Sequence, residues 1–163
     1  TNKISKSTRI SSKVSPKSLK SKLSKLKLKE YIVPGDGNCQ FHSLAYAINK
    51  NKLGKVNYSS LRKQVVNYLQ KHKKEFENFI PLENSKISIS KNFKNYVEHM
   101  SKNKVYGDNI TLYIISLLYN LKIIVLRDNR KNNIINETGK NTIYVVYHGD
   151  DGFDAHYNAT VKN

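Results

Sequence analysis

Apolar residues recur at helical spacing in four stretches of the chain. The first stretch predicts a helix from Cys39 to about Asn49, which places the only cysteine in its first turn. Ser59 or Ser60 is the expected cap of the second helix, and Asp108 or Asn109 the expected cap of the fourth. The remaining three predicted helices cover about residues 60–73, 89–100 and 109–119.

Short β-branched runs dominate the C-terminal third of the chain. The predicted strands are a brief extended entry at 31–33 and later runs at 123–126, 134–135, 143–147 and 156–161. A Gly- and Asp-rich loop is expected over 148–153. Because helices come first and strands later, the order predicts an α+β fold, a small central sheet flanked by helices.

Charge divides the chain in two. Of its 163 residues, 29 are Lys or Arg and 12 are Asp or Glu, so the formal net charge is +17. Residues 1–29 hold nine Lys and Arg9 but no acid, a net of +10, which leaves +7 for 30–163. We therefore expect a basic Ser/Lys-rich N-terminal segment, 1–29, and one folded domain, 30–163.

The basic segment contains one short amphipathic pattern. Ser15 and Pro16 are the expected cap and first residue of a helix that carries Leu19, Leu23 and Leu26 on one stripe. One interpretation docks the Leu stripe on the domain and leaves the Lys face in water. The other is contact with an acidic partner, a membrane surface or nucleic acid, although no zinc-finger spacing or RNP-like aromatic motif accompanies the charge.

Composition limits the remaining classes. A single cysteine excludes an intramolecular disulfide and favours a reducing, cytoplasmic compartment. No apolar run approaches the ~20 residues of a membrane-spanning helix, and the printed N-terminus lacks a secretory signal pattern. Abundant Lys, Asn and Ile are typical of a low-GC genome, so we also consider delivery by a virus or an intracellular bacterium into a host cytosol.

Asp36-Gly37-Asn38-Cys39 carries the most informative chemistry. A helix N-terminus stabilises negative charge, and its free N–H groups can converge on an oxyanion, so Cys39 is a candidate nucleophile. The alternative is a buried structural cysteine, since free Cys is among the most buried residue types.

Five histidines could partner the thiol. His156 and Asn158 stand at i and i+2 on a predicted strand, so Asn158 can orient the imidazole of His156. His148 has no such partner at that spacing, His42 is expected to pack or line a rim, and His72 and His99 are expected in water. No His/Cys cluster has the spacing of metal ligands, which argues against a zinc site.

Three motifs in order resemble those of the ovarian-tumour (OTU) cysteine proteases. They are Asp36-Gly37-Asn38-Cys39-Gln40-Phe41-His42-Ser43, then Tyr106-Gly107-Asp108 followed by 111–112 and 121–125, and last His156-Tyr157-Asn158. The resemblance covers about residues 30–162. It implies a small sheet between helical layers and a deubiquitinase that cleaves the isopeptide bond at the ubiquitin C-terminus, with neither metal nor cofactor.

Site roles follow from the same resemblance. Cys39 would be the nucleophile, His156 the general base and Asn158 the orienting residue, with Asp36 in the loop that shapes the oxyanion hole. Gly37, Asn38, Tyr106 and Tyr157 would contact substrate. The chain departs from the family at His42, where Arg is common, and at Tyr106, where Trp is common, and neither departure removes a catalytic group.

Two other functions remain open at this point. One is an OTU-like module that binds ubiquitin without cutting it, against which the intact Cys39, His156 and Asn158 count. The other is nucleic-acid or membrane binding through residues 1–29, which could coexist with an enzyme. The expected partners are ubiquitin, polyubiquitin chains or ubiquitin-like modifiers, bound by a monomer. Residues 76–89 are the expected location of part of the contact surface.

Overall fold

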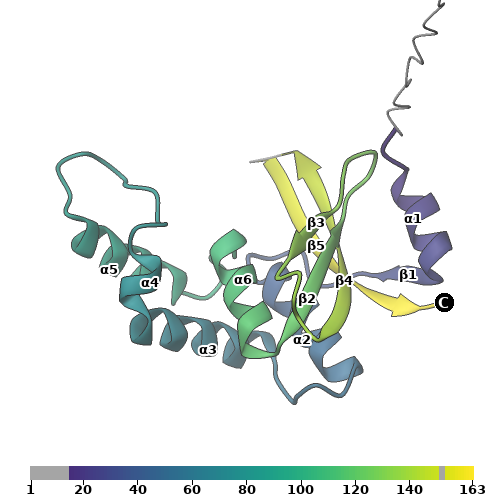
Figure 1. Cartoon of the computed structure of the whole chain (residues 1–163), viewed down its shortest axis with the longest axis horizontal. Coiled ribbons are helices and arrows are strands. Elements are labelled where there is room, and N and C mark those ends of the chain that lie inside the picture. Colours follow the sequence, from purple (N-terminus) through teal and green to yellow (C-terminus); the bar gives the residue numbers. More distant parts are fainter. Residues whose placement is uncertain (1–14, 151–152) are drawn as a thin grey trace, which may run out of the picture.

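The computed structural model describes residues 15–150 and 153–163 of the chain (Figure 1). Its helices and strands alternate only at the start, after which helices precede strands. The helices are α1 (Leu19–Leu26), α2 (Cys39–Lys50), α3 (Tyr58–Lys71), α4 (Lys73–Phe76), α5 (Ile89–Met100) and α6 (Asn109–Leu118). The strands are β1 (Leu28–Tyr31), β2 (Leu121–Leu126), β3 (Asn133–Ile135), β4 (Asn141–Asp150) and β5 (Phe153–Lys162).

The strands form one five-stranded mixed sheet in the order β1-β5-β4-β2-β3. Only β2 and β4 run parallel, and the other neighbours are antiparallel. β1 pairs with the end of β5 alone, from Leu28 opposite Lys162 to Tyr31 opposite Ala159. The first strand of the chain therefore closes on the last, and β5 has no described strand partner on that edge before Ala159.

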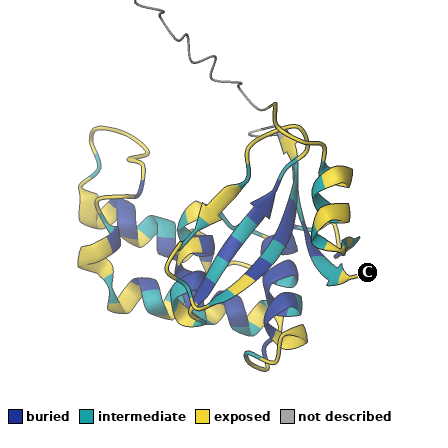
Figure 2. Cartoon of the chain, turned by 45° about the vertical axis from the view of Figure 1, so that its right-hand side comes forward, coloured by how far each residue is buried: buried dark blue, intermediate teal, exposed yellow. Residues whose placement is uncertain are grey.

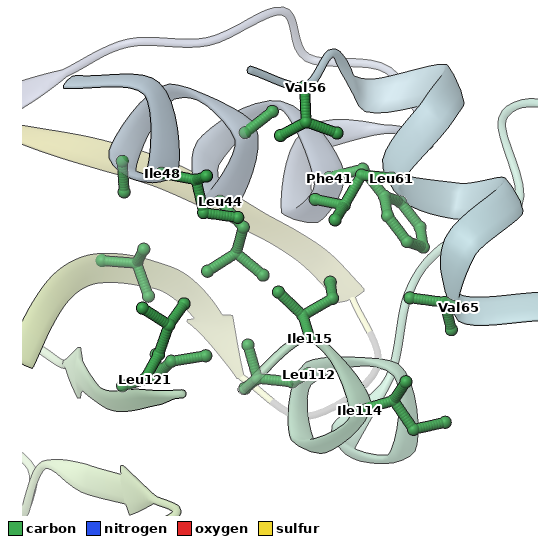
Figure 3. Close-up of a cluster of buried hydrophobic side chains, with 14 of the residues drawn as sticks. Phe41, Leu44, Ile48, Val56, Leu61, Val65, Leu112, Ile114, Ile115 and Leu121 are labelled. Carbon is green, nitrogen blue, oxygen red and sulfur yellow. The ribbon is translucent and has the colours of Figure 1, made fainter. Parts of the chain in front are cut away.

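One face of the sheet carries the main core. Ile123, Val125, Ile143 and Val145 alternate onto this face and pack against apolar side chains of α2, α3 and α6. Figure 3 shows the helical side of this cluster, where Phe41 and Leu44 of α2 meet Leu61 of α3 and the buried residues of α6. In Figure 2 the dark-blue residues concentrate in the central strands and in the helix faces turned toward them.

The predicted α+β class is confirmed, and so are the four predicted helices of the domain and the short helix of the basic segment, with corrected caps for α3 and α1. Asn57, rather than Ser59 or Ser60, caps α3, because its side chain accepts from Ser60 N while Ser60 Oγ binds back to Asn57. Ser18, rather than Ser15, caps α1. In both places a neighbouring residue with an equally good capping side chain makes the bond.

The strands are longer than the sequence pattern predicts. β2 begins at Leu121, β4 runs on to Asp150 and β5 begins at Phe153, so the loop predicted over 148–153 is mostly paired strand. Gly149 has a φ of 109° at a register shift between the two strands, which is where the pairing bends. The entry strand also lies earlier than predicted, at 28–31 instead of 31–33.

Helix α1 docks on the domain through polar groups. Lys22 donates to the carbonyls of Arg127 and Arg130 and to Asn132 Oδ1, and Leu19 N donates to Asp128 Oδ1. Leu19, Leu23 and Leu26 are half-buried and none is fully buried, while Lys20 and Lys25 are exposed, so the Leu stripe is only partly covered. β1 begins at Leu28, so its first two residues belong to the predicted N-terminal segment, 1–29, and not to the predicted domain, 30–163. Among the described residues no helix is long and apolar enough to cross a bilayer.

Two leucines of α6 test the assignment of the core. Leu112 is 1% exposed and Leu118 is 37% exposed. Leu112→Ala should lower the free energy of unfolding by about 2–5 kcal/mol, because it removes buried methyl groups and leaves a cavity. Leu118→Ala, the matched control, should cost less than about 1 kcal/mol. Urea denaturation measures both, and equal losses would contradict this packing.

Candidate active site

The loop before α2 is held by its own short-range hydrogen bonds. Asn38 N donates to Asp36 Oδ1 at 2.9 Å, and Cys39 N donates to Asp36 O at 3.2 Å. The Asp36 carboxylate also lies 3.7 Å from His42 Nε2, one helical turn on. His42 packs against the ring of Tyr58 in α3, so this histidine braces the loop, as its predicted packing role requires.

Arg62 of α3 ties this loop to the loop before α6. Its guanidinium donates to Asn38 Oδ1 and Val105 O, both at 2.7 Å, and to Met100 O at 3.0 Å. The same group lies 4.2 Å from the centroid of the Phe41 ring. Only 4% of Arg62 is exposed. The buried guanidinium of Arg62 donates to several acceptors at once and therefore fixes the position of the loop that precedes Cys39.

Gly37 and Asn38 are both used in this loop-to-loop contact. A Cβ on Gly37 would lie 1.6 Å from the Lys104 carbonyl oxygen, so only glycine lets the two backbones approach so closely. Asn38 Oδ1 also accepts from Lys104 N, and Asn38 Nδ2 donates to Asn103 Oδ1. These contacts position the loop for Cys39.

Cys39 lies in the first turn of α2, against the open edge of β5. The residue is 2% exposed and packs with Val33 and Ala159. The backbone N–H of Tyr157, part of the peptide unit that joins His156 to Tyr157, lies near enough to the thiol to lower its pKa. The sulfur thus lies beside the backbone of His156. Within residues 15–150 and 153–163, no hydrogen bond joins Cys39 Sγ to the His156 ring.

Burial governs the protonation of the thiol. Removal from water raises the pKa of Cys39, and the nearby Asp36 carboxylate raises it further. The backbone N–H groups of Tyr157, Gln40 and Cys39 lower this pKa, but by less than burial and Asp36 together raise it. The helix N-terminus therefore does not by itself produce the thiolate that the sequence pattern favours, and the resting group is a thiol.

His156 and Asn158 form a pair on β5. The His156 Nε2 lies 2.6 Å from Asn158 Oδ1, which also accepts from Val33 N at 3.1 Å. By strand alternation this pair lies on one face of the sheet, while Tyr157 and Ala159 face α2. Cys39 packs with Ala159 and Tyr157, on the face turned toward α2. Because Nε2 faces Asn158, Nδ1 is the ring nitrogen available to another group.

A pocket of about 490 Å³ opens beside the sulfur. Cys39, Tyr106 and Tyr157 all line it. Arg127, which directly follows β2, and Asn133, the first residue of β3, complete this part of the lining. Tyr106 is 59% exposed, whereas burial raises the pKa of the Tyr157 phenol to about 12. The pocket therefore gives access to the thiol, and the exposed Tyr106 ring forms part of its lining.

Gln40 forms the wall of this pocket behind the nucleophile. It donates to Asp108 O at 3.1 Å and accepts from Thr111 Oγ1 at 2.6 Å, and it lies near enough to the Tyr157 phenol to lower the pKa of that group. A Cβ on Gly107 would lie 2.1 Å from Gln40 Oε1, so this glycine makes room for the amide. Asp108 caps α6, as predicted, and holds the opposite rim.

Comparison with known proteins agrees with this arrangement. A family model described as OTU-like cysteine protease matches residues 34–157, about three quarters of the chain. The chain belongs to the OTU family of cysteine proteases. The matched range begins just before the Cys39 loop and ends at Tyr157, so the OTU domain includes the pocket.

Individual relatives agree. The OTU domain is 27% identical over 150 residues to a protein of Arabidopsis thaliana named OVARIAN TUMOR DOMAIN-containing deubiquitinating enzyme 10, covering 89% of this chain and 38% of that protein. The chain thus spans about two fifths of that relative's length. A solved OTU domain in complex with ubiquitin is similar at a TM-score of 0.64 and 26% identity, covering 82% of this chain and 69% of that one. The OTUD1 OTU domain reaches a TM-score of 0.68 at 15% identity, covering 86% and 90%.

The structure sorts the eight predicted site residues into three groups. Cys39, Tyr106 and Tyr157 line the pocket, His156 and Asn158 pair on β5, and Asp36, Gly37 and Asn38 shape the loop. Sequence reasoning missed Gln40 and Arg62. The Gln40 position lies inside the quoted OTU motif, but nothing in a single sequence shows that an arginine in a helical stretch points inward.

Arg62→Lys tests the support under the loop. A lysine keeps the charge but cannot reach three separated acceptors, and each buried acceptor left without a donor costs about 1–3 kcal/mol. We expect the free energy of unfolding to fall by about 2–4 kcal/mol in denaturant titration. Lys63→Gln, on the exposed neighbour, is the control and should change it by less than about 0.5 kcal/mol.

The thiol environment predicts a pH dependence for the free protein. Because the pKa of Cys39 is raised, alkylation by iodoacetamide should be slow at neutral pH and should accelerate only as pH rises above the ordinary thiol value of 9.0. Asp36→Asn removes a charge that raises this pKa and keeps an acceptor for Asn38 N, so its midpoint should move to lower pH. A wild-type midpoint below 7 would refute the resting thiol.

Proposed function

We propose that this OTU domain is a thiol-dependent deubiquitinase that hydrolyses isopeptide bonds at the ubiquitin C-terminus. The observation that carries the proposal is the placement of the Cys39 sulfur beside the His156–Tyr157 peptide, at the end of a pocket about 490 Å³ in volume. Family membership supports the reaction class, and a solved relative in complex with ubiquitin supports the substrate. No step of this chemistry calls for a metal or cofactor.

The mechanism begins with a thiol. His156 Nδ1, left free by the bond from Nε2 to Asn158, accepts the proton of Cys39 as the sulfur attacks the carbonyl carbon of the last ubiquitin residue. The negative charge that develops on the carbonyl oxygen is stabilised by backbone N–H groups of the Cys39 loop. Asp36 acts indirectly, since it holds that loop in its turn.

Collapse of this intermediate breaks the C–N bond. Imidazolium His156 returns the proton to the departing lysine amine, which leaves a thioester on Cys39. Water then attacks the thioester, His156 accepts its proton, and the freed ubiquitin carboxylate departs as the thiol is regenerated. Asn158 accepts from Nε2 throughout, so it stabilises the imidazolium and keeps the ring oriented.

Pocket shape supports an extended peptide as the occupant. Tyr106, Gly107 and Tyr157 line the pocket together with Cys39, and glycine at 107 leaves room for the Gln40 amide. A narrow tail such as the Gly-Gly end of ubiquitin fits this approach. Larger contacts belong elsewhere, and 79–89 offers three exposed apolar side chains, Phe79, Leu82 and Ile89, within the predicted 76–89 region.

The proposed setting is a reducing compartment, because a nucleophilic cysteine must remain unoxidised. A cytosol containing ubiquitin conjugates satisfies this requirement. Delivery into a host cytosol by a virus or bacterium stays a prediction from composition, as does the role of the basic N-terminus, of which residues 1–14 lie outside the described residues.

Ubiquitin carrying a C-terminal thiol-reactive group tests the proposal. The wild-type chain should gain the mass of one ubiquitin, and Cys39→Ala should gain none, because only a sulfur at position 39 can attack. His156→Ala should lower the turnover of a ubiquitin substrate by at least about 10³-fold.

The same assay discriminates the rival functions. Asn158→Ala should slow turnover less than His156→Ala, since it removes orientation and not the base. An adduct on Cys39→Ala would show another nucleophile. Ubiquitin binding by wild type with no adduct and no turnover would support the non-catalytic module instead.

A further inference from the structure

The amide of Asn158 is held from two directions by the segment just before the Cys39 loop. Its Oδ1 accepts from the backbone N–H of Val33 at 3.1 Å, and its Nδ2 donates to Glu30 Oε1 at 2.7 Å. A backbone N–H can only donate, and a carboxylate can only accept. The two contacts therefore fix which end of the amide faces His156, and that end is the oxygen.

We infer that Glu30 is a positioning residue for His156, acting through Asn158. The inference rests on the proposed function and deepens it. With Oδ1 turned toward the ring, His156 Nε2 must carry a proton to make the 2.6 Å contact. The neutral imidazole is then the Nε2–H tautomer, and Nδ1 holds the lone pair that accepts the proton of Cys39. Reversal of the amide would favour the opposite tautomer.

Sheet pairing brings these groups together. Glu30 is opposite Thr160 in the β1–β5 register, and Asn158 is two residues along β5 on the same face. His148 and His156 are directly opposite in the β4–β5 register. One face of three adjacent strands thus presents Glu30, Asn158, His156 and His148 in a connected cluster.

His148 holds the carboxylate from the other side. Its Nε2 contacts the same Glu30 Oε1 that accepts from Asn158, and Glu30 has little solvent around it, with 23% of its side chain exposed. The histidine for which sequence spacing offered no partner thus has one on β1, 118 residues earlier. The cluster continues from the predicted pair, His156 and Asn158, to two residues that no site motif contains.

A double exchange tests this arrangement. Asn158→Asp alone sets a carboxylate against that of Glu30, and the lost charged contact should lower kcat by about 10–100-fold. Glu30→Gln alone removes a charged acceptor and should lower kcat by about 3–10-fold. In both single variants KM should change less than twofold, since neither group touches ubiquitin. Glu30→Gln with Asn158→Asp restores one donor and one acceptor, so kcat should recover to within about threefold of wild type.

Glu98→Gln, the same substitution on an exposed glutamate of α5, is the matched control and should leave kcat unchanged. If the two substitutions multiply in the double variant, with no recovery, the positioning role is refuted. A purely structural role for Glu30 would lower thermal stability in the double variant as well, so melting curves accompany the kinetics.

Nitrogen-15 spectra of the His156 ring separate this inference from the proposed function. The neutral ring of the wild type should show the Nε2–H tautomer, and Glu30→Gln should show an increased fraction of Nδ1–H. Those spectra in a chain that cleaves no ubiquitin substrate would uphold the link from Glu30 to His156 and refute the function. A predominant Nδ1–H tautomer in an active wild type would do the reverse.

Discussion

The contact between the N-terminus of α2 and the open edge of β5 is the constraint on which the rest of the molecule depends. β1 pairs with β5 only from Ala159 to Lys162, and just before that range the backbone N–H of Tyr157 lies near enough to the Cys39 thiol to lower its pKa. The pairing between β1 and β5 therefore ends next to the candidate active site. Everything that surrounds this edge, from the Arg62 guanidinium to the Gln40 wall, fixes the approach of one helix to one strand.

The same contact sets the chemical state of the sulfur. A helix N-terminus and three N–H groups favour a thiolate, but a cysteine 2% exposed beside an aspartate favours a thiol. Because burial is the larger effect, a base must take the proton during the reaction, and this makes the tautomer of His156 decisive. The network that ends at Glu30 supplies that tautomer without touching the sulfur.

Local patterns predicted the elements well where local physics decides. Helices α2, α5 and α6 follow from apolar spacing and from caps such as Asp108. The grouping of Cys39, His156 and Asn158 in one catalytic site rests on the motifs and stays a prediction. Strand ends were predicted poorly, since Leu121 and Phe153 are strand residues only through partners on other strands. The cap of α3 was predicted at Ser59 or Ser60 and lies at Asn57, because the choice among neighbouring capping side chains depends on the turn that precedes the helix.

The sequence analysis did not predict the long-range polar contacts of Arg62 and Glu30 for a related reason. Arg62 is buried and donates to backbone carbonyls. Every residue type carries a carbonyl, so the sequence does not show which residues will accept from an arginine. Glu30 meets Asn158 over a separation of 128 residues, in a segment whose neighbours are mostly lysine. From the sequence alone, Glu30 is expected to be exposed to solvent, and only the pairing of the strands shows otherwise. Such residues become visible only when the register of β1 on β5 is in hand.

A crystal structure at neutral pH measures the central claim most directly, through the separation between Cys39 Sγ and His156 Nδ1. The account predicts about 3–4 Å, with Nε2 still bound to Asn158 and the ring reaching the sulfur around the edge of β5. A ring turned away from Cys39, with Nδ1 far from the sulfur in the free protein and in its covalent complex with ubiquitin alike, would contradict it.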